Sequence, residues 1–369
     1  MILKGCTFFN EEFEKEYGDI VIENGKIAEI GLTAEYGKDM SGMLVLPGFV
    51  DIHTHGGGGG DTCDSTPEAL NSFSRYLASC GVTSFCPTTM TLPVERLCDI
   101  VKTVSIVKND GAKILGVNLE GPFVSVNRCG AQNKEFIAKG TKSDFEKLYS
   151  ASNGTVKLIT IAPEAFESSE LIGYASEYCT VSVGHSDANS EQFKKALDDG
   201  ARHVTHLFNA MPPLHHREGG IIAAALNDSR VTCELICDGK HICPDVLKLA
   251  FNALGEDRGV VISDAMRAAG LGNGEYEFGG QRVFVNDGVA RLADSTIAAS
   301  VTNMLDEFRL LVEIGVDFKT ALKSCTINPA RVVGEDANIG SIAKGKCADL
   351  IVLNEKLELQ EVYIDGTLA

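Results

Sequence analysis

The sequence lacks the features that would place it in several classes of protein. No stretch approaches the roughly 18 apolar residues of a membrane span, and residues 1–18 lack the apolar run of a signal peptide. Basic residues are scarce, with 33 Lys and Arg against 51 Asp and Glu. The resulting net charge of -18 disfavours nucleic acid and anionic membranes as partners. The twelve cysteines show no framework spacing, so we expect reduced thiols and a cytoplasmic location.

What is present is the composition of an ordinary soluble enzyme. Apolar residues make up 44% and charged residues 23% of the 369 positions. That length suits a barrel of about 250 residues with a smaller appendage. Because the chain is acidic overall, a site for an anionic substrate would have to be locally basic.

Both ends of the chain alternate apolar and polar residues, as half-buried strands do. Asn24-Gly25 is a hairpin turn signal between two of the expected strands. Neither segment is large enough to fold alone. We therefore expect residues 1–45 and 335–369 to form one composite β-sandwich, and residues 46–334 to form the main domain.

The middle of the chain alternates short apolar strands with helices. Thr66-Pro67 begins one helix, and Ser190 caps another that Gly200 ends. Later helices are expected over 303–314 and 318–325. The eight expected strands are 44–52, 82–87, 114–119, 157–161, 180–183, 203–205, 232–237 and 260–263. Eight such units predict a closed (β/α)₈ TIM-like barrel of the α/β class.

An open doubly wound sheet is the alternative architecture. It would carry a Gly-rich phosphate loop after the first strand. The run Gly56–Gly60 matches neither the dinucleotide fingerprint nor the P-loop. This run is either a flexible loop or a place where the backbone approaches the active site closely.

Polar residues follow the strands where a barrel places its chemistry, at the carboxyl ends. Five of the eight histidines lie there. Neutral imidazoles and carboxylates are the ligands that Zn²⁺ and similar divalent ions prefer, and residues i and i+2 of a strand point the same way. The residues are His53, His55, Glu120, His185, His206, His241 and Asp264. Except for His241, which follows its strand at a distance, they predict a site for one or two metal ions.

Each of these residues taken singly has a structural reading, since a lone buried His is usually only hydrogen-bonded. The joint occurrence in barrel order favours the metal site. His203 lies at the opposite end of its strand and is expected to be structural.

Five motifs resemble a known family. The segment Leu46–His55, with its Leu-Pro-Gly-Phe-Val-Asp-Ile-His-Thr-His sequence, resembles the opening signature of the amidohydrolase superfamily. More narrowly, Asn118–Phe123, Gly184–Ser186, His206–Pro212 and Ser263–Ala265 resemble N-acetylglucosamine-6-phosphate deacetylases. The likeness extends along nearly the whole chain, and it implies removal of the acetyl group from N-acetylglucosamine 6-phosphate in amino-sugar catabolism.

The resemblance also implies roles for individual residues. Glu120, His185 and His206 would be the primary metal ligands, and His53 and His55 would complete a second site. Asp264 would contact the metal and act as the catalytic acid/base. Zinc is the first choice of ion, with iron or manganese as alternatives. Substrate contacts would come from Ala131, Gln132, Asn209, Ala210, Arg217, His241, Leu292, Ala293 and Asp294.

The family likeness further implies a homodimer in which Arg217 reaches the neighbouring active site. His215-His216-Arg217 is a basic patch in an acidic chain, and a guanidinium can bind two phosphate oxygens at once. Two positions depart from the common family pattern. Gln132 stands where some members have His, and Leu292-Ala293-Asp294 stands where a Leu-Ala-Gly stretch is frequent.

Two other functions remain open. One is a cyclic amidase or N-acyl amino acid deacylase, whose sites usually hold a carboxylated lysine. Ile161–Glu164 supplies no lysine at the end of the fourth strand, which disfavours it. The other is a sugar-phosphate-binding protein without catalysis, which predicts a decayed ligand set, whereas every expected ligand is present.

Overall fold

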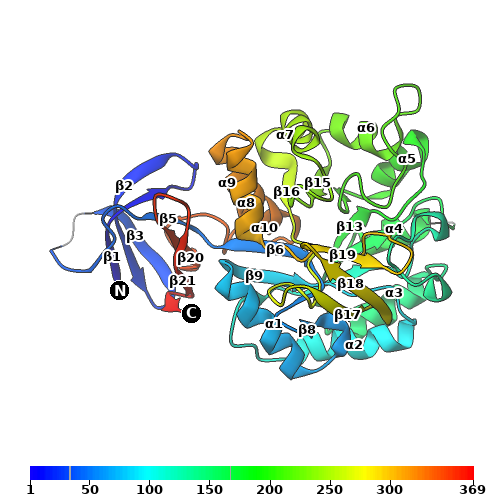
Figure 1. Cartoon of the computed structure of the whole chain (residues 1–369), viewed down its shortest axis with the longest axis horizontal. Helices are drawn as coiled ribbons and strands as arrows, with labels where there is room; N and C mark the ends of the chain where they lie inside the picture. Colours follow the sequence, from blue (N-terminus) through cyan, green and yellow to red (C-terminus); the bar gives the residue numbers. More distant parts are fainter. Residues whose placement is uncertain (33–34, 167) are drawn as a thin grey trace.

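The computed structural model describes residues 1–32, 35–166 and 168–369. Strands from both ends of the chain lie together on the left of Figure 1, and the strands and helices of the middle lie on the right. Both termini lie on the left-hand part. No helix of these described residues is long and apolar enough to cross a membrane.

Residues from both ends of the chain share one eight-stranded sheet. Its order is β22-β21-β20-β5-β1-β2-β3, with β4 beside β1. Leu3, Phe8, Ile20, Leu350 and Val352 form a separate apolar core on it. The strands are β1 (Ile2–Phe9), β2 (Lys15–Glu23), β3 (Lys26–Leu32), β4 (Lys38–Asp39), β5 (Leu44–Pro47), β20 (Leu350–Leu353), β21 (Leu359–Ile364) and β22 (Thr367–Leu368).

The middle of the chain holds two sheets in which every ladder is parallel. Their orders are β10-β9-β6 and β11-β12-β13-β14-β15-β16. A parallel bridge between Thr88 and Asn118 joins the sheets at one seam. At the other seam, Asp264 N–H donates to His53 O at 3.0 Å. The strands are β6 (Phe49–Thr54), β9 (Val82–Pro87), β10 (Lys113–Ile114), β11 (Val117–Glu120), β12 (Val156–Ile161), β13 (Thr180–Val183), β14 (His203–Val204), β15 (Thr232–Leu235) and β16 (Gly259–Val261).

Helices follow these strands in alternation and cover them (Figure 1). Thr66 accepts a hydrogen bond from Ala69 N–H, and Pro67 occupies the first turn, so α1 begins as the sequence predicts. The helices are α1 (Pro67–Ser79), α2 (Val94–Ile106), α3 (Lys142–Ala151), α4 (Ser169–Ala175), α5 (Ser190–Asp199), α6 (Gly220–Asn227), α7 (Pro244–Arg258), α8 (Met304–Glu313), α9 (Phe318–Cys325) and α10 (Ile327–Val332).

Three expected boundaries are wrong. The single strand expected over 114–119 is divided into β10, which pairs with β9, and β11, which pairs with β12. The single strand expected over 44–52 is divided at Gly48 into β5, which joins the sheet of the chain ends, and β6, which pairs with β9. A Cβ on Gly48 would lie 2.2 Å from Thr83, so only glycine fits this crossing. The cap of α5 is Asn189, whose side chain accepts from Glu191 and Gln192 N–H, and Ser190 is already helical.

The run Gly56–Gly60 forms a short hairpin of β7 (Gly56–Gly57) and β8 (Gly60–Asp61). A Cβ on Gly57 would lie 2.3 Å from the ring of Tyr76, and one on Gly60 would lie 2.1 Å from Ala69 O. The backbone of this run does approach another element closely, but that element is helix α1 and not the active site that the second reading named.

A three-stranded antiparallel sheet after β16 was not expected from the sequence. It consists of β17 (Gly274–Phe278), β18 (Gln281–Asn286) and β19 (Val289–Leu292). The alternation in Gln281–Asn286 and the turns at Gly279-Gly280 and Asp287-Gly288 are the signals that could have predicted it. Its Gln281 Nε2 donates to Ala131 O at 2.6 Å, which ties it to the rest of the chain.

Candidate metal centre

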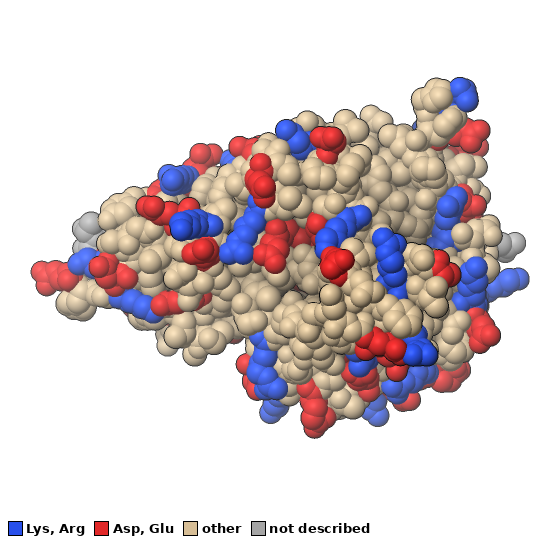
Figure 2. Space-filling view, viewed as in Figure 1, with Lys and Arg blue, Asp and Glu red and all other residues tan. Residues whose placement is uncertain are grey.

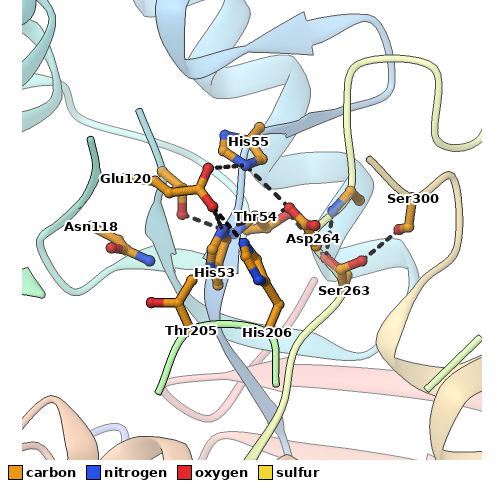
Figure 3. Close-up of polar contacts among 12 residues, drawn as sticks. His53, Thr54, His55, Asn118, Glu120, Thr205, His206, Ser263, Asp264 and Ser300 are labelled. Atoms are coloured by element: carbon orange, nitrogen blue, oxygen red, sulfur yellow. Dashed lines mark hydrogen bonds and ion pairs between the residues drawn. The ribbon is translucent and has the colours of Figure 1, made fainter. Parts of the chain in front are cut away.

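Six residues expected at the strand ends meet in one place, and Figure 3 labels all of them except His185. His53 and His55 come from β6 and the residue after it, Glu120 ends β11, and Asp264 follows β16. His185 and His206 follow β13 and β14. The ligand atoms of Glu120, His185 and His206 lie within 4.8 Å of one another, as do those of His53, His55 and Glu120.

One oxygen of Glu120 is the centre of the first group. Glu120 Oε1 lies 2.9 Å from His185 Nε2 and 2.8 Å from His206 Nε2, and the two nitrogens are 3.1 Å apart. His185 Nδ1 lies 2.9 Å from Arg128 O, which can only accept, so Nδ1 carries the hydrogen. The Nε2 lone pair of a neutral His185 therefore faces a carboxylate oxygen. Such a contact is stable only with positive charge between or on these groups, and a divalent cation fits it.

The second group lies on the other side of the same carboxylate. His55 Nε2 is 3.3 Å from Glu120 Oε2 and 3.1 Å from Asp264 Oδ1. His53 Nε2 is 3.4 Å from Glu120 Oε1, is completely buried, and has no hydrogen-bond partner among the described residues. A buried nitrogen without a partner is costly unless it binds a cation.

The electrostatics of the cluster favour positive charge. Burial opposes protonation of His55, but hydrogen bonds with Asp264 and Glu120 raise its pKa to about 9. Burial alone would raise the pKa of Glu120, yet His53 and His185 lower it well below its ordinary value. The carboxylates therefore attract positive charge strongly, which a bound metal ion would satisfy in place of protons.

The backbone is strained where three of these side chains leave their strands. His185, His206 and Asp264 have φ angles of 45°, 26° and 46°. Positive φ disfavours residues with a side chain, and such strain concentrates at functional sites. With these backbone angles, the side chains of His185, His206 and Asp264 point into the cluster.

A cavity opens above the cluster and contains most of the predicted substrate contacts. Of these, it is lined by Ala131, Gln132, Asn209, Ala210 and His241, together with His55, Glu120, His185, His206 and Asp264. His53 lies beneath it. The structure thus brings together residues that are far apart in the sequence.

His241 and Gln132 are fixed by neighbouring groups. Asp238 Oδ2 lies 2.7 Å from His241 Nδ1, and Asp238 Oδ1 accepts from His241 N–H. Gln132 Nε2 donates to Glu120 Oε2 at 2.6 Å. Gln132, predicted to contact substrate, therefore also orients the carboxylate at the centre of the cluster.

Four predicted residues do not line the cavity. Arg217 is exposed beside His216, in a separate groove next to α5. Leu292, Ala293 and Asp294 lie at the end of β19 and in the turn that follows. Thr296, Ile297 and Ala298, a few residues further, line the cavity instead.

Other residues of the cavity wall were not expected from the sequence. Phe278 of β17 lies edge-on to His55, with ring centroids 5.0 Å apart, and Met90 and Ile236 contribute apolar surface. Phe278 could be found only by predicting the β17–β19 sheet. Glu234, buried on β15 against His53 and His203, was also missed. A carboxylate inside the apolar run 231–237 is the signal that could have revealed it.

Parallel strands with histidine and carboxylate ligands at their carboxyl ends define a metal-dependent hydrolase of the amidohydrolase type. The comparison with known families agrees. The chain belongs to the amidohydrolase family, whose profile matches residues 44–369.

Relatives within this family are similar over the whole chain. The N-acetylglucosamine-6-phosphate deacetylase of Bacillus subtilis is 37% identical, over 100% of this chain and 97% of its own length. The N-acetylgalactosamine-6-phosphate deacetylase of Escherichia coli O157:H7 is 32% identical, over 100% and 99%. A solved variant of the Mycobacterium smegmatis N-acetyl-D-glucosamine-6-phosphate deacetylase, in complex with N-acetyl-D-glucosamine-6-phosphate, has a TM-score of 0.94 at 33% identity, covering 100% and 98%.

Proposed function

We propose that this chain hydrolyses the acetamide of N-acetyl-D-glucosamine 6-phosphate to D-glucosamine 6-phosphate and acetate, in amino-sugar catabolism. The observation that carries the proposal is the convergence of His185 and His206 on one oxygen of Glu120, with the Asp264 carboxylate facing the same cavity. Full-length relatives that are named for this reaction support the choice of substrate.

Two sets of residues would bind metal ions in the proposed enzyme. Glu120, His185 and His206 hold the first ion, and His53 and His55, with Asp264 beside them, hold a second. Zn²⁺ suits these ligands, and Fe²⁺ or Mn²⁺ are alternatives. When bound, a divalent cation makes a water molecule more acidic and polarises the acetamide carbonyl.

Asp264 moves the proton. Its carboxylate accepts a proton from the attacking water and then donates it to the amide nitrogen as the C–N bond breaks. One carboxylate can perform both steps in sequence, a contribution of about 10²–10⁴ in rate. Asp264 is 8% exposed, and that exposure is toward the cavity, where a substrate would lie.

The remaining residues bind and orient the sugar phosphate. His241, held by Asp238, presents Nε2 to the substrate, while Ala131, Gln132 and the backbone of Asn209-Ala210 line the same wall. Leu292–Asp294 are proposed to contact substrate at the cavity edge. Arg217 lies outside the cavity of its own chain. We assign it to the phosphate in the neighbouring subunit of a homodimer, a use that suits its exposed position.

The architecture of the proposed enzyme is a closed eight-stranded barrel over 46–334 with a composite β-sandwich of 1–45 and 335–369. The hydrogen bond between Asp264 N–H and His53 O at the second seam supports closure. We propose a cytoplasmic location, and we propose no nucleic acid or membrane partner. Acidic and basic side chains are interspersed on the face shown in Figure 2, without the continuous basic patch that would attract nucleic acid or an anionic membrane.

Acetate release tests the substrate. We expect turnover of N-acetylglucosamine 6-phosphate to exceed that of N-acetylglucosamine and of N-acetylgalactosamine 6-phosphate. Equal rates with the first two would contradict the role of the phosphate. Faster turnover of N-acetylgalactosamine 6-phosphate would instead indicate the substrate for which the Escherichia coli O157:H7 relative, at 32% identity, is named.

Two competing functions fit the structure less well. Cyclic amidases and N-acyl amino acid deacylases usually use a carboxylated lysine. No lysine lines the cavity among the residues that the structure describes, and Glu164 at the end of β12 is engaged by Ser186 and Asp187 N–H. A non-catalytic binding protein would not need the buried, mutually repelling ligand set found here.

A further inference from the structure

Glu234 is a completely buried carboxylate beneath the metal centre. Its Oε2 lies 2.9 Å from His53 Nδ1 and accepts from the backbone N–H of His206 at 3.1 Å. Its Oε1 lies 3.1 Å from His203 Nε2. One side chain at 0% exposure thus contacts three histidines, two of which belong to the candidate metal centre.

The contact with His53 fixes which ring nitrogen is free. A carboxylate accepts hydrogen bonds, so His53 Nδ1 carries the hydrogen and Nε2 keeps its lone pair. That lone pair faces the cluster, 3.4 Å from Glu120 Oε1 and 3.6 Å from Asp264 Oδ1. Glu234 therefore sets both the tautomer and the ring orientation that metal binding by His53 requires.

The other ligands are oriented by different groups. His185 Nδ1 lies against Arg128 O, and Glu120 accepts from Gln132. The hydrogen bond between Glu234 and His206 involves only the backbone of His206, and the next residue is held independently of the Glu234 side chain, because Leu207 N–H donates to Glu234 O at 2.8 Å. The side-chain influence of Glu234 thus falls on the His53–His55 side of the centre.

His203 supports Glu234 from behind. Its Nε2 faces Glu234 and its Nδ1 lies 2.6 Å from Thr232 Oγ1. A single line of contacts therefore runs from Thr232 through His203 and Glu234 to His53. This line explains why a histidine stands at the amino end of β14, far from the cavity.

We propose that Glu234 is the positioning residue of the His53–His55 site and thereby decides whether this chain binds a second metal ion. This inference rests on the proposed two-ion centre. The first site, formed by Glu120, His185 and His206, keeps its own supports when Glu234 is changed. The effect of a change at Glu234 is therefore unequal between the two ions.

Glu234→Gln tests the inference with little change in volume. The amide removes the negative charge beside His53 Nδ1 and leaves His53 and His203 to compete for a single accepting oxygen, so His53 becomes a weaker and less firmly oriented ligand. Zn²⁺ is titrated into the metal-free protein, and calorimetry and elemental analysis measure how many ions bind and how tightly. We expect one of the two binding steps to weaken in the variant. The affinity of that step should fall by about 10–100-fold, while the other step stays unchanged.

Glu307→Gln is the matched control. Glu307 is also a fully buried carboxylate, at 0% exposure, but it forms no hydrogen bond with any ligand. It should retain two Zn²⁺ ions per chain. Thermal unfolding of each metal-free variant reports folding separately from metal binding. Should Glu234→Gln fail to fold, Glu234→Asp, which keeps the charge but shortens the reach to His53, is expected to weaken the same step.

The outcomes are distinct. Two unchanged binding steps in Glu234→Gln would overturn the inference, as would equal weakening of both steps. A wild-type chain with a single Zn²⁺ step would overturn the two-ion centre and the inference with it. Metal titration needs no substrate, so a failure of the proposed deacetylation shows separately, as absent acetate release from a chain that binds two ions.

Discussion

Gln132 and Glu120 are joined by a hydrogen bond of 2.6 Å between the amide Nε2 and the carboxylate Oε2. The amide cannot turn over, because its Oε1 accepts from Thr91 N–H at 2.6 Å. The bond leaves Glu120 Oε1 facing His185 and His206. Gln132 thus holds the central carboxylate in place.

Replacing Gln132 should therefore weaken the centre. In Gln132→Ala, Glu120 loses the amide that donates to its Oε2, and we expect kcat/KM and metal affinity to fall by about 10–100-fold. Steady-state kinetics and metal titration measure the two effects. Gln192→Ala, which removes a surface cap on α5, serves as control. Unchanged metal affinity in Gln132→Ala would show that Gln132 acts on substrate alone.

Asp264→Asn should separate chemistry from metal binding. The amide cannot carry the proton from water to nitrogen, so kcat should fall by about 10²–10⁴. The Glu120, His185 and His206 set is untouched, and the ion that it binds should remain by elemental analysis. Asp228→Asn, at a surface ion pair with Arg230, should keep full activity. An active Asp264→Asn would remove Asp264 from the proton transfer.

Removing metal should lower both activity and stability. Ions that bind only the folded chain stabilise it, by about 2.7 kcal/mol at 100 times their Kd. We expect a chelator to abolish acetate release and lower Tm, and added Zn²⁺, Fe²⁺ or Mn²⁺ to restore both. Full activity in a chain shown to be metal-free would exclude metal catalysis.

Arg217→Ala should raise KM for the phosphorylated substrate at least about tenfold, because a charge-assisted bidentate pair is lost. Turnover of the unphosphorylated sugar should not change, and Arg230→Ala should behave as wild type. Mixing Arg217→Ala with Asp264→Asn chains tests the subunit assignment. Mixed dimers recover activity if the arginine acts across the interface, and no recovery would place it in its own chain's site.

The buried carboxyl group of Glu307 should make the free energy of unfolding depend on pH. Burial, with repulsion from Asp238 and Asp51, raises the pKa of Glu307 well above 4.5. Between 4.5 and the raised value, the folded state keeps a proton that the unfolded state releases, so stability falls as pH rises. The slope reaches about 1.4 kcal/mol per pH unit.

Glu307→Gln removes this slope. In urea unfolding between about pH 5 and pH 8, the free energy of unfolding of the variant should rise relative to that of the wild type as pH increases. Glu313→Gln, an exposed position on the same helix, should follow the wild-type curve. Parallel curves for wild type and Glu307→Gln would mean that Glu307 titrates normally.

The sequence predicts the metal centre better than the cavity. His53, His55, Glu120 and Asp264 could be predicted because a strand end fixes their direction locally. Phe278 and Thr296–Ala298 could not, since their place depends on how the β17–β19 sheet packs against Met90, Ala131 and Met266. Glu234 was missed because its partners His53 and His203 are 181 and 31 residues away. Ser190 was mistaken for a cap because Asn and Ser cap helices equally well.

The shared sheet of the two chain ends has a consequence for synthesis. Strand β20 pairs with β5 on one side and β21 on the other. The sheet begun by the first 47 residues therefore cannot be completed until residues 350–368 have been synthesised. Until then β5 presents an open edge, directly before the strand that carries His53. During synthesis, the strands that carry the metal ligands are therefore made while this sheet is still incomplete. The last strands to be synthesised, β20 to β22, are the ones that cover the open edge of β5.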